Sequence, residues 1–343
     1  MILTNLAHSD GVASFAIQMY RNMDHERFSV DFLVHDRIDE DYASLVSENN
    51  DHVFSVGSLS MKRYPQLKKS FHRILQENSY DVVHCNLPNM AWLYLKLAQK
   101  EKVRMRIVHV HQTSYAETKS HAIRNKILFK IGRKYSNLNL ACSEMAGKFY
   151  FGEESFTTIY NGIDYERFSF NEERRRRIRK ELKIDEDEVL FGQVGRYSIV
   201  KNQSFTLSLF HGRKEKVVLI GSGTKEEYFK SLEKEKGQNI MLLDVKSNVE
   251  DYYCAMDYLL LPSLYEGLPI VALEAQATGL TCIMADTITK ECDFGNGMYL
   301  PLEMENWKQG LPDSIPTNRK SLYDSRFDGK IQAERLEQIY SGK

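Results

Sequence analysis

The sequence predicts an α/β protein of two doubly wound domains, each a parallel sheet covered by helices. Ten short β-rich runs alternate with stretches of helical pattern, as expected of βα units. Apolar residues within these runs are consecutive rather than alternate, which indicates strands buried on both faces. The chain of 343 residues can also hold two domains of roughly 150 residues each. The runs are 30–35, 81–85, 105–111, 137–142 and 157–162, then 189–195, 216–223, 239–245, 257–263 and 280–286.

A change in composition marks the predicted domain boundary. Between residues 161 and 188 the apolar strands give way to a charged, helix-prone stretch. We therefore expect a first domain over 1–165 and a second over 166–343. Four consecutive arginines, Arg174 to Arg177, occur just after this boundary. Because glutamates flank them, the pattern favours a solvated helix face over an anion site.

Composition and charge exclude several classes of protein. Apolar residues make up 42% of the chain and charged residues 27%, and the formal net charge is −1. A nucleic-acid partner is not expected, because proteins that bind nucleic acid carry a strong excess of basic residues. The five cysteines are odd in number, and most lie in apolar runs, which indicates buried thiols in a reducing compartment. No apolar stretch approaches a membrane span, and the start lacks a signal-peptide pattern, so the expected location is cytoplasmic.

Motifs for metals and phosphates are weak or missing. The chain has no P-loop, no H-E-x-x-H and no paired C-x-x-C. The segment GSGTKE (221–226) follows a predicted strand with only two glycines, which is a weak phosphate-turn signal. The acidic triplet 185–187 has the D-x-D spacing of a metal site but lies in a polar run before a strand. We expect no metal and no cofactor.

The segment LLLPSLYEGLPIVALEAQATG (259–279) carries two glutamates around a helix start. Ligands of open α/β sheets bind beyond the carboxyl ends of strands, so Glu266 lies on a loop at the expected ligand edge. A helix is predicted from about 269 to 278, begun by Pro269 and ended by Gly279. Its free amides and positive dipole end suit a phosphate.

The second glutamate of this segment, Glu274, lies one turn inside the predicted helix and would face the same edge. A carboxylate there can accept hydrogen bonds from two hydroxyls, as a ribose offers. The alternative is that Glu266 caps the helix and that Glu274 is an ordinary surface residue.

Recognition of a family sharpens these expectations. The stretch YEGLPIVALEAQATGL resembles the E-x7-E signature of family 4 glycosyltransferases, which are retaining enzymes of the two-domain GT-B fold. Segment 192–205 is similar to the family's V-G-R…K-N segment, and 141–152 and 159–164 are similar to its end-of-domain segments. Segment 286–291 is similar to members that build extracellular and capsular polysaccharides.

The resemblance implies roles for particular residues in the second domain. Glu266 would hold hydroxyls of the donor sugar, and Glu274 the ribose. Diphosphate binding would fall to the residues Arg196, Lys201, Gly267, Leu268 and, from the first domain, Gly11. Arg196 and Lys201 follow a predicted strand closely, and such cations stabilise phosphate without a metal. The alternative is that both are solvent-facing loop cations.

In the first domain the resemblance places His111 at the donor sugar near the reacting centre. A structural histidine at the sheet edge is the alternative. Segment HSDGVASF (8–15) resembles the family's Gly-Gly turn, with Gly11 as the second glycine, but Asp10 stands where the first is expected. The segment of chain between Asn202 and Val217 is also short, so it has room for a helix of only about nine or ten residues.

The implied reaction moves a sugar, with retention, from a nucleotide diphosphate donor to a hydroxyl of a glycan or lipid-linked acceptor. UDP is the expected nucleotide, the acceptor is expected against residues 1–165, and the domains are expected to close around the donor. Two alternatives remain at this point: a nucleotide-sugar epimerase of similar build, and an inert relative that only binds nucleotide sugars or a partner enzyme.

A basic amphipathic helix is predicted within 119–138, a segment that has six cations and no acidic residue. Its apolar residues, Ile123, Ile127, Leu128 and Ile131, recur at helical spacing. We expect the apolar stripe to pack on the sheet while the basic side faces an anionic membrane surface on the inner face of the cell membrane. The alternative is that the cations simply face water.

Overall fold

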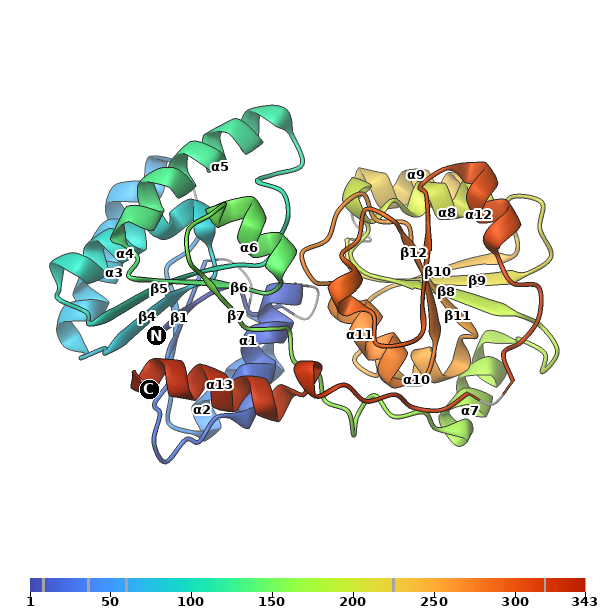
Figure 1. Ribbon diagram of the computed structural model, residues 1–343, viewed down its shortest axis with the longest axis horizontal. Helices are drawn as coiled ribbons and strands as arrows, with labels where there is room; N and C mark the ends of the chain where they lie inside the picture. The colour runs from blue at the N-terminus through green and yellow to red at the C-terminus, as the bar shows by residue number, and fades with distance from the viewer. Residues whose placement is uncertain (8–9, 36–37, 59–60, 224–225, 318, 343) are drawn as a thin grey trace. The chain divides into compact units, whose positions relative to one another are not determined.

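A computed structural model describes residues 1–342 apart from 8–9, 36–37, 59–60, 224–225 and 318. The chain forms two compact units, each described here by itself. Unit 1 comprises Met1–Gly162 and Gly329–Lys343, and unit 2 comprises Ile163–Asp328. Each unit contains a parallel sheet with helices around it (Figure 1). The predicted fold class is therefore confirmed.

Unit 1 is built on a seven-stranded parallel sheet in the order β3-β2-β1-β4-β5-β6-β7. The chain starts at the centre, moves outward through β2 and β3, and returns to place β4 on the other side of β1. The strands are β1 (Ile2–Leu3), β2 (Phe32–Val34), β3 (Val53–Ser55), β4 (Val82–Cys85), β5 (Met105–Val110), β6 (Leu138–Ala141) and β7 (Thr157–Thr158).

Helices cover both faces of this sheet. Figure 1 shows α3, α4 and α5 side by side on one face and α1 with α13 on the other. The described helices of unit 1 are α1 (Gly11–Asn22), α2 (Glu40–Glu48), α3 (Tyr64–Glu77), α4 (Ala91–Lys100), α5 (Lys119–Gly132), α6 (Glu144–Phe151) and α13 (Gly329–Ser341), with short 3-10 helices η1 (Met61–Arg63), η2 (Pro88–Met90) and η3 (Arg133–Tyr135).

Unit 2 is built on a six-stranded parallel sheet in the order β10-β9-β8-β11-β12-β13. Its strands are β8 (Leu190–Val194), β9 (Lys216–Ile220), β10 (Ile240–Leu243), β11 (Tyr258–Leu261), β12 (Thr281–Ala285) and β13 (Gly297–Leu300). The described helices are α7 (Glu172–Leu182), α8 (Gln203–Leu209), α9 (Glu227–Glu235), α10 (Val249–Ala255), α11 (Ile270–Ala277) and α12 (Met304–Gly310), with 3-10 helices η4 (Ile199–Lys201), η5 (Lys290–Cys292) and η6 (Ser325–Phe327).

The ten predicted strand runs all contain a strand, but three strands were not predicted. One is β1, a central strand of only two residues, which is too short to form a recognisable run. The other two are β3 and β13. Both are edge strands of their sheets. Their residues are half-buried or exposed, in contrast to the fully buried Leu259 and Leu260 of β11. An edge strand pairs on one side only and has less need of a continuous apolar run, so it carries a weaker sequence signal.

The C-terminal helix corrects the predicted domain limits. The change between units falls at Gly162, close to the predicted boundary, but α13 returns to unit 1 instead of belonging to a domain over 166–343. The Tyr340 hydroxyl lies 2.6 Å from His84 Nδ1, and Glu337 accepts a hydrogen bond from the Asp24 amide. A Cβ on Gly162 would lie 2.6 Å from the Gly329 Cα, so the two passages of the chain cross in close contact.

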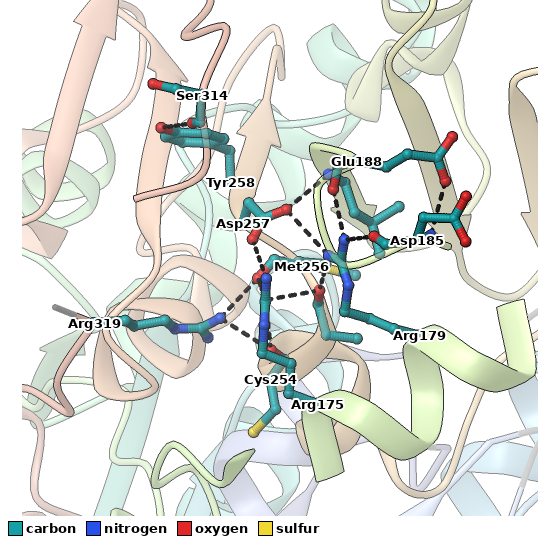
Figure 2. A network of polar contacts seen from close by, with 12 residues as sticks. Arg175, Arg179, Asp185, Glu188, Cys254, Met256, Asp257, Tyr258, Ser314 and Arg319 are labelled. Carbon is teal, nitrogen blue, oxygen red and sulfur yellow. Dashed lines mark hydrogen bonds and ion pairs between the residues drawn. The ribbon is translucent and has the colours of Figure 1, made fainter. Parts of the chain in front are cut away.

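A buried ion network ties α7 to the sheet of unit 2. It corrects the prediction of a solvated arginine face for Arg175, whereas Arg176 and Arg177 are exposed as predicted. Figure 2 shows Arg175, Arg179 and Arg319 converging around Asp257 and the backbone of 254–256. Asp257 accepts from Arg175 at 2.6 Å and from the Leu190 amide at 2.8 Å. Four of the helix's arginines therefore pair with carboxylates of the neighbouring elements, namely Arg174 and Arg177 with Asp251 and Arg175 and Arg179 with Asp257.

Helix α5 packs on α4 and η2 and turns a different face inward from the one predicted. Phe129 and Gly132 are buried and face inward, whereas Ile123, Ile127 and Ile131 are exposed. The expectation that the apolar stripe packs on the sheet is wrong, because the inner side of α5 carries Phe129, which packs against α6, and Gly132, which lies against α4.

Two predicted features fall partly outside the described residues. The turn at 8–15 includes residues 8 and 9, and the weak phosphate turn at 221–226 includes residues 224 and 225. All five cysteines are buried and free, as predicted. In the described part of the chain, no helix is long and apolar enough to cross a bilayer.

Candidate active site

The predicted ligand residues of unit 2 gather where the strand order reverses. Beyond β8 the chain turns to β9 on one side, and beyond β11 it turns to β12 on the other. Arg196 follows β8 and Glu266 follows β11, so both lie at the carboxyl ends of neighbouring strands. Such a reversal opens a crevice in which α/β proteins bind ligands.

Glycines shape the loop that follows β8. Gly195 has φ +147°, and a Cβ on Gly221 would lie 1.9 Å from the Gly195 carbonyl oxygen. Only glycine permits the ends of β8 and β9 to approach this closely. Buried Tyr197 holds the loop by donating its hydroxyl toward the carbonyls of Leu219 and Leu243 at 2.9 and 2.8 Å. Arg196 lies between Gly195 and Tyr197, whose contacts hold the backbone of the loop in place. Its own side chain is exposed.

The structure joins the predicted phosphate cation to the predicted sugar carboxylate. Lys201 Nζ donates to Glu266 Oε1 at 2.6 Å, and both side chains are largely buried. Two backbone-anchored contacts hold the loops together: Asn202 Nδ2 donates to the Pro262 carbonyl, and the Leu264 amide donates to the Val200 carbonyl. Lys201 is therefore not a solvent-facing loop cation.

Helix α11 starts beside this pair, as predicted. It begins at Ile270 with Pro269 as its N-cap residue, and Gly279 follows its end with φ +77°. Gly267 and the buried Leu268 connect Glu266 to the helix. The first amides of the helix thus lie within a few residues of Glu266, in a position that suits an anionic group.

Glu274 is not the ordinary surface residue of the alternative. It accepts a hydrogen bond from the hydroxyl of fully buried Tyr253 at 2.9 Å. Burial raises the pKa of Glu274 to about 7. A carboxyl with this pKa changes its charge near neutral pH. Tyr253 was not predicted as a site residue, and its position inside a short helix gave no signal.

Unit 1 has a polar cavity of about 230 Å³ at its own reversal of strand order, between β1 and β4. Its walls combine polar side chains at the strand ends with aromatic rings from α5, α6 and the loop before α5. The lining residues used below are Thr4, Asp10, Asn86, His111, Asn125 and Phe129.

His111 lies in this cavity, directly after β5. Its Nε2 is 2.8 Å from Asn86 Oδ1, and its ring packs 4.0 Å from that of His109. Burial lowers the pKa of His111 to about 3, so the imidazole is neutral at physiological pH. With Nε2 as the donor to Asn86, Nδ1 becomes an acceptor. Sequence reasoning missed Asn86, although it directly follows a predicted strand.

Asp10 and Gly11 form the start of α1 at the same cavity. Asp10 caps the helix by accepting a hydrogen bond from the Val12 amide at 2.9 Å, and Gly11 is the first helical residue. The departure from the family's double glycine thus places an N-cap carboxylate at this edge. Two buried polar atoms in the cavity, Thr4 Oγ1 and Asn86 Nδ2, have no partner among the described residues. Both residues line the cavity, and buried polar atoms without a partner are uncommon in native structures unless a water or a ligand satisfies them.

The matches to known families divide the chain as the fold does. The sequence model described as "Glycosyltransferase Family 4" matches residues 9–167, and the one described as "Glycosyl transferases group 1" matches 174–293. This chain is a glycosyltransferase with one domain of each family. The family assignment, the GT-B fold and the transferase activity expected from the motifs are thereby confirmed.

Individual relatives of this glycosyltransferase agree. EpsF of Bacillus subtilis, which is named as a glycosyltransferase, is 29% identical over 96% of this chain and 93% of its own. CapH of Staphylococcus aureus, a capsular polysaccharide biosynthesis glycosyltransferase, is 27% identical over 80% of each chain. The crystal structure of Anabaena HepE with UDP and glucose covers 100% of this chain and 99% of its own, with TM-score 0.83 and 16% identity, and so shares the fold. Because the relatives are named as transferases, the epimerase alternative is not favoured.

Proposed function

We propose that this enzyme transfers a sugar, with retention, from a UDP-linked donor to a hydroxyl of a glycan or lipid-linked acceptor in polysaccharide biosynthesis. The observation that carries the proposal is the convergence of Arg196, Lys201, Glu266 and the start of α11 at the strand reversal of unit 2. Cations and helix amides suit the diphosphate, and carboxylates suit sugar hydroxyls. UDP in the HepE structure and the polysaccharide role in the name of CapH support the choice of donor and product class.

Each predicted residue keeps a stated role in the proposal. Arg196 and Lys201 stabilise the charge that grows on the leaving diphosphate, together with the backbone of Gly267 and Leu268. Glu266 holds hydroxyls of the transferred sugar, and Glu274 the ribose.

In unit 1, His111 contacts the transferred sugar as a neutral acceptor, and the glycine turn at Gly11 offers helix amides to the diphosphate. The cavity with unpartnered Thr4 Oγ1 and Asn86 Nδ2 supplies hydrogen bonds to the acceptor. Polar atoms beside aromatic walls suit a sugar ring, which has both hydroxyl edges and apolar faces.

The proposed reaction uses no metal ion and no cofactor. In the proposed reaction two side-chain cations, Arg196 and Lys201, and the start of α11 neutralise the diphosphate in place of a divalent ion. Among the described residues, no group of three or more His, Cys, Asp or Glu side chains is arranged to hold a metal.

Attachment to an anionic membrane at the inner face of the cell is part of the proposal. The segment 119–138 has six cations and no acidic residue. Within the described residues, Arg133 alone of these cations pairs with a carboxylate, that of Glu154. Reversal of Lys126, Lys130 and Lys134 to Glu should remove low-salt binding to anionic vesicles, and unchanged binding would contradict the attachment.

A donor screen tests the proposal as a whole. Purified enzyme is incubated with a panel of UDP-sugars, with and without lipid-linked glycan acceptors, and both UDP release and product are measured. We expect UDP release that depends on an acceptor, and product with the anomeric configuration of the donor. Conversion of the donor sugar without acceptor would support an epimerase, and donor binding without turnover under any acceptor would support an inert binding protein.

A further inference from the structure

Helix α5 carries a row of exposed isoleucines on the surface of unit 1. Ile123, Ile127 and Ile131 expose 64%, 55% and 42% of their surface. Residues four apart share one face of a helix, so the three side chains form a single ridge, here called the isoleucine ridge. Three large aliphatic side chains in one row on a helix surface indicate a surface that is covered in use.

Contacts on the opposite face fix this orientation. A Cβ on Gly132 would lie 2.4 Å from the Trp92 amide nitrogen, so α5 sits directly against the start of α4. The Phe129 ring packs 4.9 Å from that of Tyr150, and Asn125 Nδ2 donates to the Tyr115 carbonyl at 2.8 Å. The helix cannot turn to bury its isoleucines without losing these contacts.

Cations flank the isoleucine ridge. Lys126 and Lys130 precede Ile127 and Ile131 by one residue, so they form a parallel row beside the ridge. Arg124 lies on its other side, and Lys119 and Lys134 lie near the two ends of the helix. An exposed apolar stripe with lysines on one side and an arginine on the other resembles the pattern of helices that lie at the surface of anionic lipid.

We propose that the isoleucine ridge inserts into the headgroup and acyl boundary of an anionic bilayer, while the flanking cations bind lipid phosphates. The partner is thus a lipid surface, and insertion adds an apolar contribution to the electrostatic attachment described above. This inference rests on the proposed membrane location and not on the transfer chemistry.

The shape of the ridge favours lipid over a protein partner. Its three isoleucines span eight residue steps of one helix, or about 12 Å. A convex ridge of this size needs a matching groove on a protein, and stable protein interfaces bury about 800 Å² on each partner. A fluid bilayer adapts to a convex ridge and supplies the negative charge that the lysines match.

The same helix also reaches the cavity of unit 1. Asn125 and Phe129 line the cavity from the inner side of α5, and the ridge lies on its outer side. Insertion of the ridge would therefore place the cavity within one helix diameter of the bilayer, on the order of 10 Å. That is a suitable place for the hydroxyl of a lipid-linked acceptor.

Vesicle binding of the full chain tests the insertion. The probe is vesicles of phosphatidylglycerol and phosphatidylcholine, without donor or acceptor, at low and high salt. Ile127→Ser should lower the partition coefficient about tenfold, since one aliphatic side chain loses its burial. The triple variant Ile123→Ser, Ile127→Ser, Ile131→Ser should lose binding at high salt and keep at low salt only the weaker binding that its cations provide. Val245→Ser, at a residue of unit 2 with 45% exposure, is the matched control and should bind like the wild type.

A label reports insertion directly. The five native cysteines are buried, so an environment-sensitive dye reacts selectively with Ile127→Cys. Its emission should shift to the blue on anionic vesicles, and the same dye on Val245→Cys should not shift. Wild-type vesicle binding by the triple variant, or no shift at position 127, would overturn the proposal. An oligomer of the wild type that the triple variant converts to monomer would overturn it in favour of a second copy as the partner.

Transfer to a water-soluble acceptor separates this inference from the proposed function. The triple variant should retain that activity, because its three residues lie outside the cavity lining and the donor residues. If the wild-type enzyme transfers the sugar but its ridge does not insert into vesicles, the insertion proposal is rejected and the proposed reaction stands. If the ridge inserts but no sugar is transferred, the proposed reaction is rejected and the insertion stands.

Discussion

Lys201 Nζ donates a hydrogen bond to Glu266 Oε1 at 2.6 Å, although the residues lie 65 positions apart in the chain. The pair joins the loop after β8 to the loop after β11 across the strand reversal of unit 2. When no UDP-sugar is bound, the charges of Lys201 and Glu266 neutralise each other. In the proposed reaction the ammonium turns to the diphosphate and the carboxylate to the sugar, so the two partners should respond differently to substitution.

Glu266→Ala should lower kcat/KM by on the order of 10²-fold, because it removes charge-assisted contacts to sugar hydroxyls. Its affinity for UDP alone should stay the same or rise, since Lys201 is released for the diphosphate. Transfer rates and calorimetric titration with UDP measure the two effects. Loss of UDP affinity together with unchanged transfer would contradict the assignment. Glu274→Ala should also impair transfer, but less.

Arg196→Ala should weaken UDP binding by about 1.5–3 kcal/mol, the range for hydrogen bonds to charged groups. Arg176→Ala is the matched control, because Arg176 lies on the surface of the same unit and is 72% exposed. Calorimetry on both variants decides the matter. Equal UDP affinity of the Arg196 variant and the wild type would reject a diphosphate contact.

Activity should persist in excess chelator, since cationic side chains and helix amides are proposed to neutralise the diphosphate. Initial rates are measured in EDTA and then after addition of Mg²⁺ or Mn²⁺. Rates that collapse in EDTA and return with the metal would show that an ion is required.

Glu274 should make stability depend on pH. Its folded pKa of about 7 lies above the ordinary value of 4.5, so the folded state binds the proton more tightly than the unfolded state. The stabilisation is complete below about pH 4.5 and is lost as pH rises through 7. Glu274→Gln cannot ionise, so the difference in unfolding free energy between wild type and variant should change by roughly 1–3 kcal/mol between pH 5 and 8. Urea unfolding at several pH values measures it, and a constant difference would contradict the raised pKa.

The affinity for the sugar donor should rise with pH because of Glu274, whereas the folding stability falls. Ribose hydroxyls donate to the ionised carboxylate, so the affinity for a UDP-sugar should rise, up to about tenfold, between pH 6 and 8. The measurement uses a UDP-sugar instead of UDP, because the phosphates of a UDP-sugar do not titrate between pH 6 and 8. In Glu274→Gln the trend should vanish, and a trend that survives would place its origin elsewhere.

Asp257→Ala should destabilise the enzyme by about 3–5 kcal/mol, because it leaves the guanidinium groups of Arg175 and Arg179 without their carboxylate inside the network of Figure 2. Arg176→Ala should change stability by less than about 0.5 kcal/mol. Chemical unfolding of both variants provides the test. A small effect at Asp257 would mean that water replaces the carboxylate in the network.

The sequence by itself determined the fold class, the family and the positions of the central strands other than the two-residue β1. Continuous apolar runs such as 258–261 have few alternatives to a buried parallel strand, and short motifs such as Glu266 and Glu274 with their spacing are local in the chain. Element limits that depend on local residues were also predictable. Pro269 and Gly279 bracket α11 because proline and glycine act on the backbone of their own neighbourhood.

Only the tertiary structure decided which residues pair across the chain. The contact of Lys201 with Glu266, the return of Tyr340 to His84 and the pairing of Arg175 with Asp257 each join distant residues, and nothing in the local pattern specifies them. The face of α5 was decided in the same way. Amphipathic spacing shows that a helix has an apolar side, but the isoleucines stayed outside because Gly132 allows α4 to approach from the opposite side.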